Sequence, residues 1–153
     1  MLTLKTLTEI CKRLNQAGVE YGIIGGFAIF LHGYERTTKD IDLLIDPSET
    51  NINKLKGALK DVLPEACHEL TTDDVINNVV VRMSGENLVV DLMAKVGDIT
   101  YANAKFVPET IEEVIIPVAD LDTMIELKKG VRDRDQRDYL FLRGKKEFLE
   151  RQK

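Results

Sequence analysis

The chain has 153 residues, enough to bury one hydrophobic core and too few for two independent ones, so we expect a single domain over 1–153. Its composition, 44% hydrophobic and 31% charged with four prolines, excludes a disordered, collagen-like or coiled-coil chain. The net charge of −5 is uneven, because residues 128–153 carry ten Lys and Arg against five Asp and Glu. This basic end is either a solvated helix face or a phosphate-binding surface.

The N-terminal sequence MLTLKTLTEICKRLNQ carries a charge every few residues. It has neither the apolar region of a signal peptide nor the length of a membrane span, so we expect a cytoplasmic protein without membrane contact. Cys11 and Cys67 lie far apart without CxxC spacing, and no disulfide or zinc framework is predicted.

Apolar periodicity predicts an amphipathic helix over 4–17 and then a short buried strand over 19–24. The apolar segment 27–31 follows two glycines and is expected to form a short helix packed into the core. His32 comes next, and we expect it to be a hydrogen-bonding residue at the helix end rather than a catalytic base.

A second strand is predicted over 41–45. Ser48 is a good N-cap for a helix that extends to about residue 62, with Pro64 just beyond its end. A polar connection is expected after this helix.

Two β-rich runs, 79–83 and 88–93, flank a turn sequence and predict a hairpin. A further strand is expected over 115–118, a helix from Asp120 to about Gly130, and a last helix from 133 or 135 toward the C-terminus. This order predicts an α+β fold (an α/β mixed sheet) in which helices pack on a small mixed β-sheet.

The triplet Asp-Ile-Asp at the start of the second strand is the first chemical signal. Asp40 and Asp42 are two residues apart, so their side chains point to the same side of the strand. Two carboxylates held this close repel each other, and a cation is expected between them. Since the ligands are all oxygen, a hard cation such as Mg²⁺ or Mn²⁺ is favoured; the other interpretation is a structural or capping pair.

Asp91 interrupts the apolar run Leu-Val-Val-Asp-Leu-Met, where an unpaired carboxylate is costly to bury. It is the candidate for a third carboxylate ligand, although an edge residue that faces water would look the same. Gly25 and Gly26 separate the first strand from a helix, where backbone N–H groups can approach an anion such as a triphosphate, or where the chain simply turns.

These residues resemble a known signature. The pattern GGFAIFLHGYERTTKDIDLLID is similar to the active-site motif of the nucleotidyltransferase superfamily that includes DNA polymerase beta. The small bacterial branch, with abortive-infection toxins and lincosamide and aminoglycoside nucleotidyltransferases, is the most similar. A second segment, LDTMIELKKGVRDRDQRDYLFL, resembles the helical pattern near the C-terminus of that branch.

The resemblance implies a catalytic core over about 18–95 and a helical part over about 120–150. It implies that Asp40, Asp42 and Asp91 hold two Mg²⁺ or Mn²⁺ ions and carry the catalysis, with Asp91 nearest in role to a general base. It also implies that the two glycines, Gly25 and Gly26, form a phosphate cradle. Many members have a serine after the first glycine, and Gly26 here leaves that contact to backbone amides.

Other residues of the two motifs are candidates for binding the nucleotide. Arg36, Lys39 and Lys128 are expected to neutralise phosphates, and each could equally be a surface charge. Thr38 either orients the loop before the Asp pair or begins the strand.

The resemblance implies transfer of a nucleoside monophosphate from a nucleoside triphosphate, ATP or another, to a hydroxyl group, with release of pyrophosphate. The acceptor could be tRNA, a small molecule such as an antibiotic, or a partner protein. The basic C-terminal segment slightly favours nucleic acid, and the acidic remainder argues against it. The alternative is a non-catalytic nucleotide-binding or regulatory module, for example a toxin–antitoxin component, and the acceptor site could also lie at an interface with a second subunit.

Overall fold

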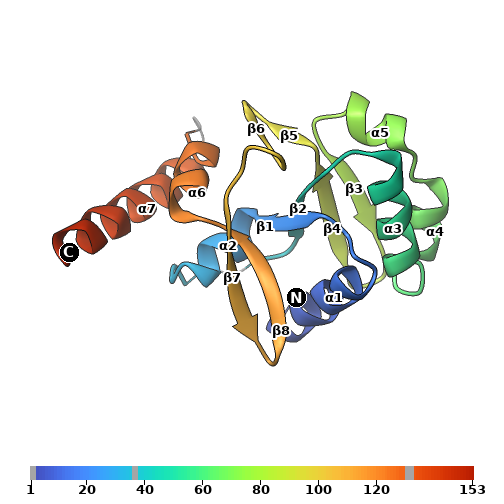
Figure 1. Cartoon of the computed structure of the whole chain (residues 1–153), viewed down its shortest axis with the longest axis horizontal. Helices are drawn as coiled ribbons and strands as arrows, with labels where there is room; N and C mark the ends of the chain where they lie inside the picture. The colour runs from blue at the N-terminus through green and yellow to red at the C-terminus, as the bar shows by residue number, and fades with distance from the viewer. Residues whose placement is uncertain (1–2, 36–37, 130–132) are drawn as a thin grey trace.

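A six-stranded mixed β-sheet lies at the centre of the computed structural model, which describes residues 3–35, 38–129 and 133–153. The strand order is β3-β4-β2-β1-β8-β7 (Figure 1). The strands are β1 (Tyr21–Ile24), β2 (Ile41–Ile45), β3 (Val81–Ser84), β4 (Val89–Met93), β7 (Phe106–Ile111) and β8 (Val114–Ala119). A separate two-stranded ribbon consists of β5 (Lys95–Val96) and β6 (Ile99–Thr100).

The sheet combines parallel and antiparallel pairs. β1 is antiparallel to β2, whereas β2 runs parallel to β4 and β1 runs parallel to β8. The outer pairs, β3 with β4 and β7 with β8, are antiparallel. Every residue of β1 and all but one of β2 are buried, so both faces of the sheet are covered at its centre. The predicted α+β class with a mixed sheet is confirmed.

The helices are α1 (Leu4–Gln16), α2 (Gly25–Leu31), α3 (Glu49–Leu59), α4 (Pro64–Glu69), α5 (Thr72–Asn77), α6 (Leu121–Leu127) and α7 (Asp133–Arg151). The Thr3 side chain caps α1, and the helix buries one apolar stripe against α3 and β8. Ser48 caps α3 by accepting a hydrogen bond from the Asn51 N–H, and Asp120 caps α6 in the same way. The helices predicted over 4–17, after Ser48 and after Asp120 are therefore confirmed, as are the strands predicted over 19–24, 41–45, 79–83, 88–93 and 115–118, with ends that differ by a few residues.

Three regions differ from the prediction, and one of them is the short ribbon of β5 and β6, which was not predicted. The expected polar connection after α3 contains two short helices, because Pro64 begins α4 instead of only ending α3, and because Thr71 and Asp74 form a capping box for α5. The strand β7 was not predicted. It pairs with β8 along its whole length, and its sequence Phe-Val-Pro-Glu-Thr-Ile is that of an edge strand with little buried apolar surface.

The C-terminal helix α7 extends away from the sheet (Figure 1), and residues near its middle hold it to the rest of the chain. Leu142 is fully buried, and the Phe141 ring meets Tyr34 edge to face with ring centroids 4.8 Å apart. Lys145 Nζ donates to the His32 carbonyl oxygen at 2.7 Å. His32 ends α2 and its Nε2 hydrogen-bonds the Ala119 carbonyl oxygen at 2.8 Å, which confirms its expected place at a helix end.

None of the helices in the described residues is both long and apolar enough to cross a bilayer.

Asn51 ties the ends of β1 and β2 together. Its side-chain oxygen accepts from the Glu20 N–H at 2.7 Å, and its Nδ2 donates to the carbonyl oxygens of Glu20 and Asp46 at 2.9 and 2.7 Å. The Asn51 side chain is buried, and its three hydrogen bonds to these backbone groups are part-buried.

We therefore expect Asn51→Ala to lower the free energy of unfolding by about 1 to 3 kcal/mol, because three part-buried hydrogen bonds are lost and, among the described residues, only the Glu20 carbonyl oxygen keeps another donor, the Asp46 N–H. Urea denaturation followed by circular dichroism measures this loss. The control is Asn53→Ala, an exposed position of the same helix, where we expect a change within about 0.5 kcal/mol. Equal losses for the two variants would contradict the structural role given to Asn51.

Candidate active site

The junction between β1 and α2 requires glycine at its first position. Gly25 has φ +72°, a conformation that other residues rarely adopt, and a Cβ placed on it would collide with the Asp42 carboxylate. A Cβ on Gly26 would come within 2.9 Å of the Thr38 methyl group, and Thr38 is buried. The chain therefore passes next to the Asp42 carboxylate because no side chain intervenes.

Three carboxylates lie on one face of the sheet. Asp42 on β2 and Asp91 on β4 are register partners in a parallel pair, and Asp40 precedes Asp42 by two residues. Partners in neighbouring strands share a face, as do residues two apart along one strand. The structure thus brings together the three carboxylates that the sequence singles out.

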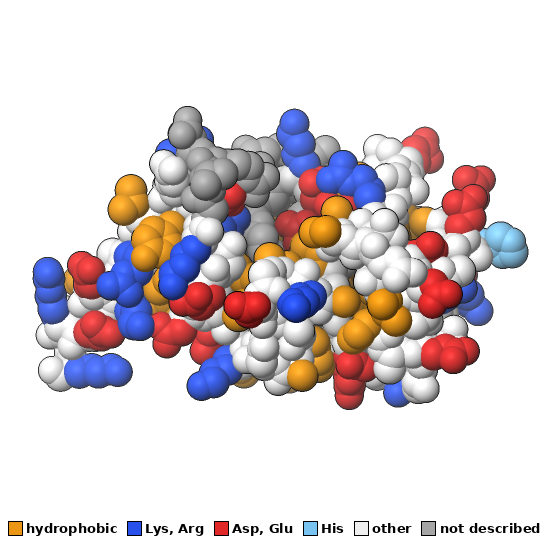
Figure 2. Space-filling model, turned by 90° about the horizontal axis from the view of Figure 1, so that it is seen from above, with side chains coloured by type: hydrophobic (Ala, Val, Ile, Leu, Met, Phe, Trp, Pro, Cys, Tyr) orange, Lys and Arg blue, Asp and Glu red, His pale blue; other side chains and the backbone are white. Residues whose placement is uncertain are grey.

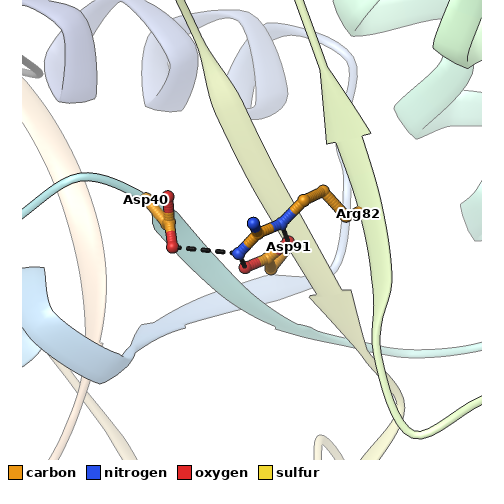
Figure 3. A network of polar contacts seen from close by, with 3 residues as sticks. All are labelled: Asp40, Arg82 and Asp91. Carbon is orange, nitrogen blue, oxygen red and sulfur yellow. Dashed lines mark hydrogen bonds and ion pairs between the residues drawn. The ribbon is translucent and has the colours of Figure 1, made fainter.

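Arg82 on β3 is a site residue that the sequence analysis missed. Its Nε donates to Asp91 Oδ1 at 3.0 Å, and its Nη2 donates to Asp91 Oδ2 at 3.0 Å and to Asp40 Oδ2 at 3.1 Å (Figure 3). The available signal was the hairpin register: Ser84 pairs with Val89, so Arg82 falls opposite Asp91. A fork-shaped guanidinium that binds both oxygens of a carboxylate is the stronger form of such a pair.

Burial is the main electrostatic constraint on Asp42. Burial, and then the neighbouring Asp91 and Asp40 carboxylates, raise the pKa of Asp42 to about 7, while Lys128 and the Gly26 backbone N–H act in the opposite direction. In the metal-free chain, therefore, Asp42 takes up a proton near neutral pH.

Lys128 follows α6 and contacts the beginning of α7. Its Nζ lies 3.0 Å from Asp138 Oδ2 and 3.6 Å from Asp135 Oδ1, and its side chain is only 12% exposed. The two carboxylates fix the ammonium group close enough to Asp42 to influence its pKa. The lysine of the second motif thus belongs to the same site as the carboxylates of the first.

These groups line one cavity with a volume of about 870 Å³. The predicted site residues on its wall are Gly25, Gly26, Thr38, Lys39, Asp40, Asp42, Asp91 and Lys128. Arg36, the remaining predicted residue, lies outside the described residues. On the face shown in Figure 2, acidic and basic side chains gather around a hollow near the middle of the molecule. A cavity of this size is in the range of small-molecule and cofactor sites.

The residue types suit a hard divalent cation, although the present arrangement holds a guanidinium. Within the described ranges, no three Asp, Glu, His or Cys side chains are placed so that they could hold a metal ion. The candidate ligand atoms at the site are nevertheless all carboxylate oxygens, and those of Asp40 and Asp91 contact the guanidinium of Arg82 in this structure. Metal binding by Asp40, Asp42 and Asp91 stays a prediction.

Comparison with known proteins agrees with the two motifs. A family model described as a nucleotidyl transferase of unknown function (DUF2204) matches residues 3–140. No curated protein matches the sequence.

Three solved structures have a similar fold. An antigenic nucleotidyltransferase-like protein from Paracoccidioides brasiliensis aligns with a TM-score of 0.62 and 17% identity, over 91% of this chain and 74% of that one. The lincomycin-bound lincosamide antibiotic adenylyltransferase LnuA aligns with a TM-score of 0.61 and 19% identity, over 93% and 97% of the two chains. ANT(2″)-Ia, in complex with adenylyl-2″-tobramycin, aligns with a TM-score of 0.56 and 14% identity, over 90% and 86%.

The raised pKa of Asp42 predicts a pH-dependent gain of stability in Asp42→Asn. The ordinary pKa of 3.8 applies to the unfolded chain, so the folded wild type loses stability relative to this variant as pH rises from about 4 to about 7. In EDTA, we expect the variant to match wild type near pH 4 and to exceed it by up to about 4 kcal/mol at pH 8. Chemical denaturation across this pH range measures the difference, and a gain that does not change with pH would contradict the assigned cause.

Two glycine variants test the close approach at the β1–α2 junction. Gly25→Ala places a methyl group against the Asp42 carboxylate at a positive φ, so we expect it to lower the free energy of unfolding by about 2 kcal/mol or more. Gly57→Ala in α3 meets no atom within 4 Å and should be neutral or stabilising by about 0.5 to 1 kcal/mol. Thermal denaturation of both variants checks the opposite signs.

Proposed function

The chain belongs to the nucleotidyl transferase family of unknown function (DUF2204), and on that premise we propose that it transfers a nucleoside monophosphate from a nucleoside triphosphate to a hydroxyl group. The acceptor oxygen forms a bond to the α-phosphorus, the bond from that phosphorus to the bridging oxygen breaks, and pyrophosphate leaves. The acceptor's proton passes to a base or to water.

The observation that carries this proposal is the convergence of the two motifs on one cavity. Asp40, Asp42, Asp91 and Lys128 all line it, although Asp91 and Lys128 are far from the Asp pair in sequence. Negative charge grows on phosphoryl oxygens during the reaction, so cations and cation-binding carboxylates must lie together.

The carboxylates would hold Mg²⁺ or Mn²⁺, as two ions. Bound there, such ions lower the pKa of the attacking hydroxyl and neutralise the triphosphate. The residues of the chain itself have separate tasks: Gly25 and Gly26 let the backbone at the start of α2 lie against Asp42 and Thr38 on the cavity wall, and Lys128 and Lys39 supply positive charge there.

A small hydroxyl compound is the acceptor that we place first. The cavity of about 870 Å³ has the size of a small-molecule site, and two of the similar folds belong to proteins described with lincomycin or an adenylylated tobramycin. A tRNA end and a protein side chain are the other acceptors to be tested.

One observation favours a second candidate, a nucleotide-binding or regulatory module without turnover. Arg82 already pairs with Asp91 and Asp40, so part of their negative charge is offset without a metal ion. Such a module would bind a triphosphate and release no pyrophosphate with any acceptor.

Pyrophosphate release distinguishes the two candidates. The full chain is incubated with Mg²⁺ or Mn²⁺, each of the four ribonucleoside triphosphates, and a lincosamide, an aminoglycoside, total tRNA or a protein extract. We expect release with at least one combination and a loss of at least about 100-fold in Asp40→Asn, because several kcal/mol of charge stabilisation disappear.

Asp73→Asn is the matched control, since it removes an exposed carboxylate on α5 that does not line the cavity. Its rate should equal that of wild type. Triphosphate binding without pyrophosphate release in any combination would support the regulatory candidate and exclude the enzyme.

A further inference from the structure

Arg82 occupies the carboxylate oxygens that the proposed function gives to a metal ion. Its guanidinium binds both oxygens of Asp91 and one of Asp40, at 3.0 to 3.1 Å (Figure 3). A divalent ion held by the same carboxylates would sit against a fixed positive charge at close range. Arg82 in the position seen here therefore disfavours the binding of a metal ion by these carboxylates.

The two sides of this ion pair differ in their access to water. The Arg82 side chain comes from β3, at one edge of the sheet, and is 58% exposed, whereas the Asp91 side chain is 8% exposed. Arg82 can move into solvent without a large desolvation cost. Asp91 cannot do so, and a buried carboxylate without a cation is costly. Asp91 therefore needs a cation beside it, and a metal ion could take the place of the Arg82 guanidinium.

We propose that the Arg82 guanidinium pairs with Asp91 and Asp40 when no metal ion is bound, and that it moves away from them when a divalent metal ion binds. The inference rests on the proposed function, because it takes the metal site from it. No covalent bond changes: the guanidinium leaves its carboxylate partners, and the ion takes their oxygens. Arg82 in this role offsets part of the negative charge of the metal-free site and weakens its affinity for metal.

A purely structural role for Arg82 makes the opposite prediction. If the guanidinium only orients Asp91 for metal binding, its removal leaves the carboxylate misplaced and weakens the affinity for metal. If it competes with the metal, its removal strengthens that affinity. The sign of the change in Kd therefore separates the two roles.

The first experiment measures Mn²⁺ binding to the full chain in the absence of nucleotide, from the electron paramagnetic resonance signal of free Mn²⁺. The variants are Arg82→Gln and Arg82→Lys. We expect Arg82→Gln to bind Mn²⁺ roughly tenfold more tightly than wild type, which corresponds to the loss of one charge-assisted contact. Arg82→Lys keeps the charge without the fork, so its Kd should lie between the two.

Arg13→Gln is the matched control. Arg13 Nε binds Glu9 Oε1 at 3.1 Å and its Nη1 lies 3.8 Å from Asp61 Oδ2, so this variant also loses a guanidinium shared by two carboxylates and one positive charge. It does not line the cavity, and its Kd for Mn²⁺ should equal that of wild type.

The second experiment uses wild type only and so does not depend on whether a variant folds. Phenylglyoxal modifies free guanidinium groups, and peptide mass spectrometry reports the rate at Arg82. We expect Mn²⁺ to increase this rate several-fold and to leave the rate at Arg13 unchanged.

Unchanged or weaker Mn²⁺ binding by Arg82→Gln overturns the inference, as does an unchanged labelling rate in wild type that binds Mn²⁺. Either result leaves the proposed metal site intact. If neither wild type nor Arg82→Gln binds Mn²⁺ at millimolar concentration, the inference falls together with the metal dependence of the proposed function. If Arg82→Gln binds Mn²⁺ more tightly but wild type releases no pyrophosphate, the inference is supported and the proposed nucleotidyl transfer is rejected.

Discussion

The repulsion among three carboxylates on adjacent strands is the constraint on which the rest of the site depends. Asp42 and Asp91 are register partners, so the hydrogen bonding of β2 to β4 holds their charges side by side. Three features of the chain reduce this repulsion. Asp42 has a pKa raised to about 7, Arg82 binds Asp91 and Asp40, and Lys128 lies near enough to favour the ionised form of Asp42. The three residues concerned, Asp42, Arg82 and Lys128, come from different elements of the fold.

The same constraint explains why distant segments meet. β3 contributes the guanidinium, and the boundary between α6 and α7 contributes the ammonium group, which is itself fixed by Asp135 and Asp138. The helical C-terminal part is thereby connected to the sheet by charge as well as by the buried Leu142. Membership of a nucleotidyl transferase family supports nucleotidyl transfer as the general activity, and such chemistry requires positive and negative groups in one cavity.

The sequence predicted the parts of the structure that depend on local patterns. The apolar stripe of α1 and the cap at Ser48 are readable because helix periodicity and capping act within a few residues. Pro64 was read only as the end of a helix, although proline also favours a first helical turn. β7 was missed because an edge strand with Pro and Glu buries too little apolar surface to show the alternation of a strand.

The candidate site, like the fold, was predicted only in part. The glycine pair and the three carboxylates carry a signal at each position, and the structure brings them together. Arg82 carries none, because an exposed arginine on a strand is ordinary until its cross-strand partner is known. The partners of Lys128 were equally hidden, since a contact between the end of one helix and the next depends on packing.

The position of Arg82 on an edge strand has a consequence for how this protein can diverge. β4 joins β3 to β2, so a replacement at position 82 alters a side chain at the rim and leaves the interior pairing of β2 with β4 untouched. Asp42 and Asp91 lie on the interior strands β2 and β4, where few substitutions are tolerated. If the carboxylates hold a metal ion as proposed, a change at this one peripheral residue would alter the cation concentration at which the site fills while every carboxylate is kept.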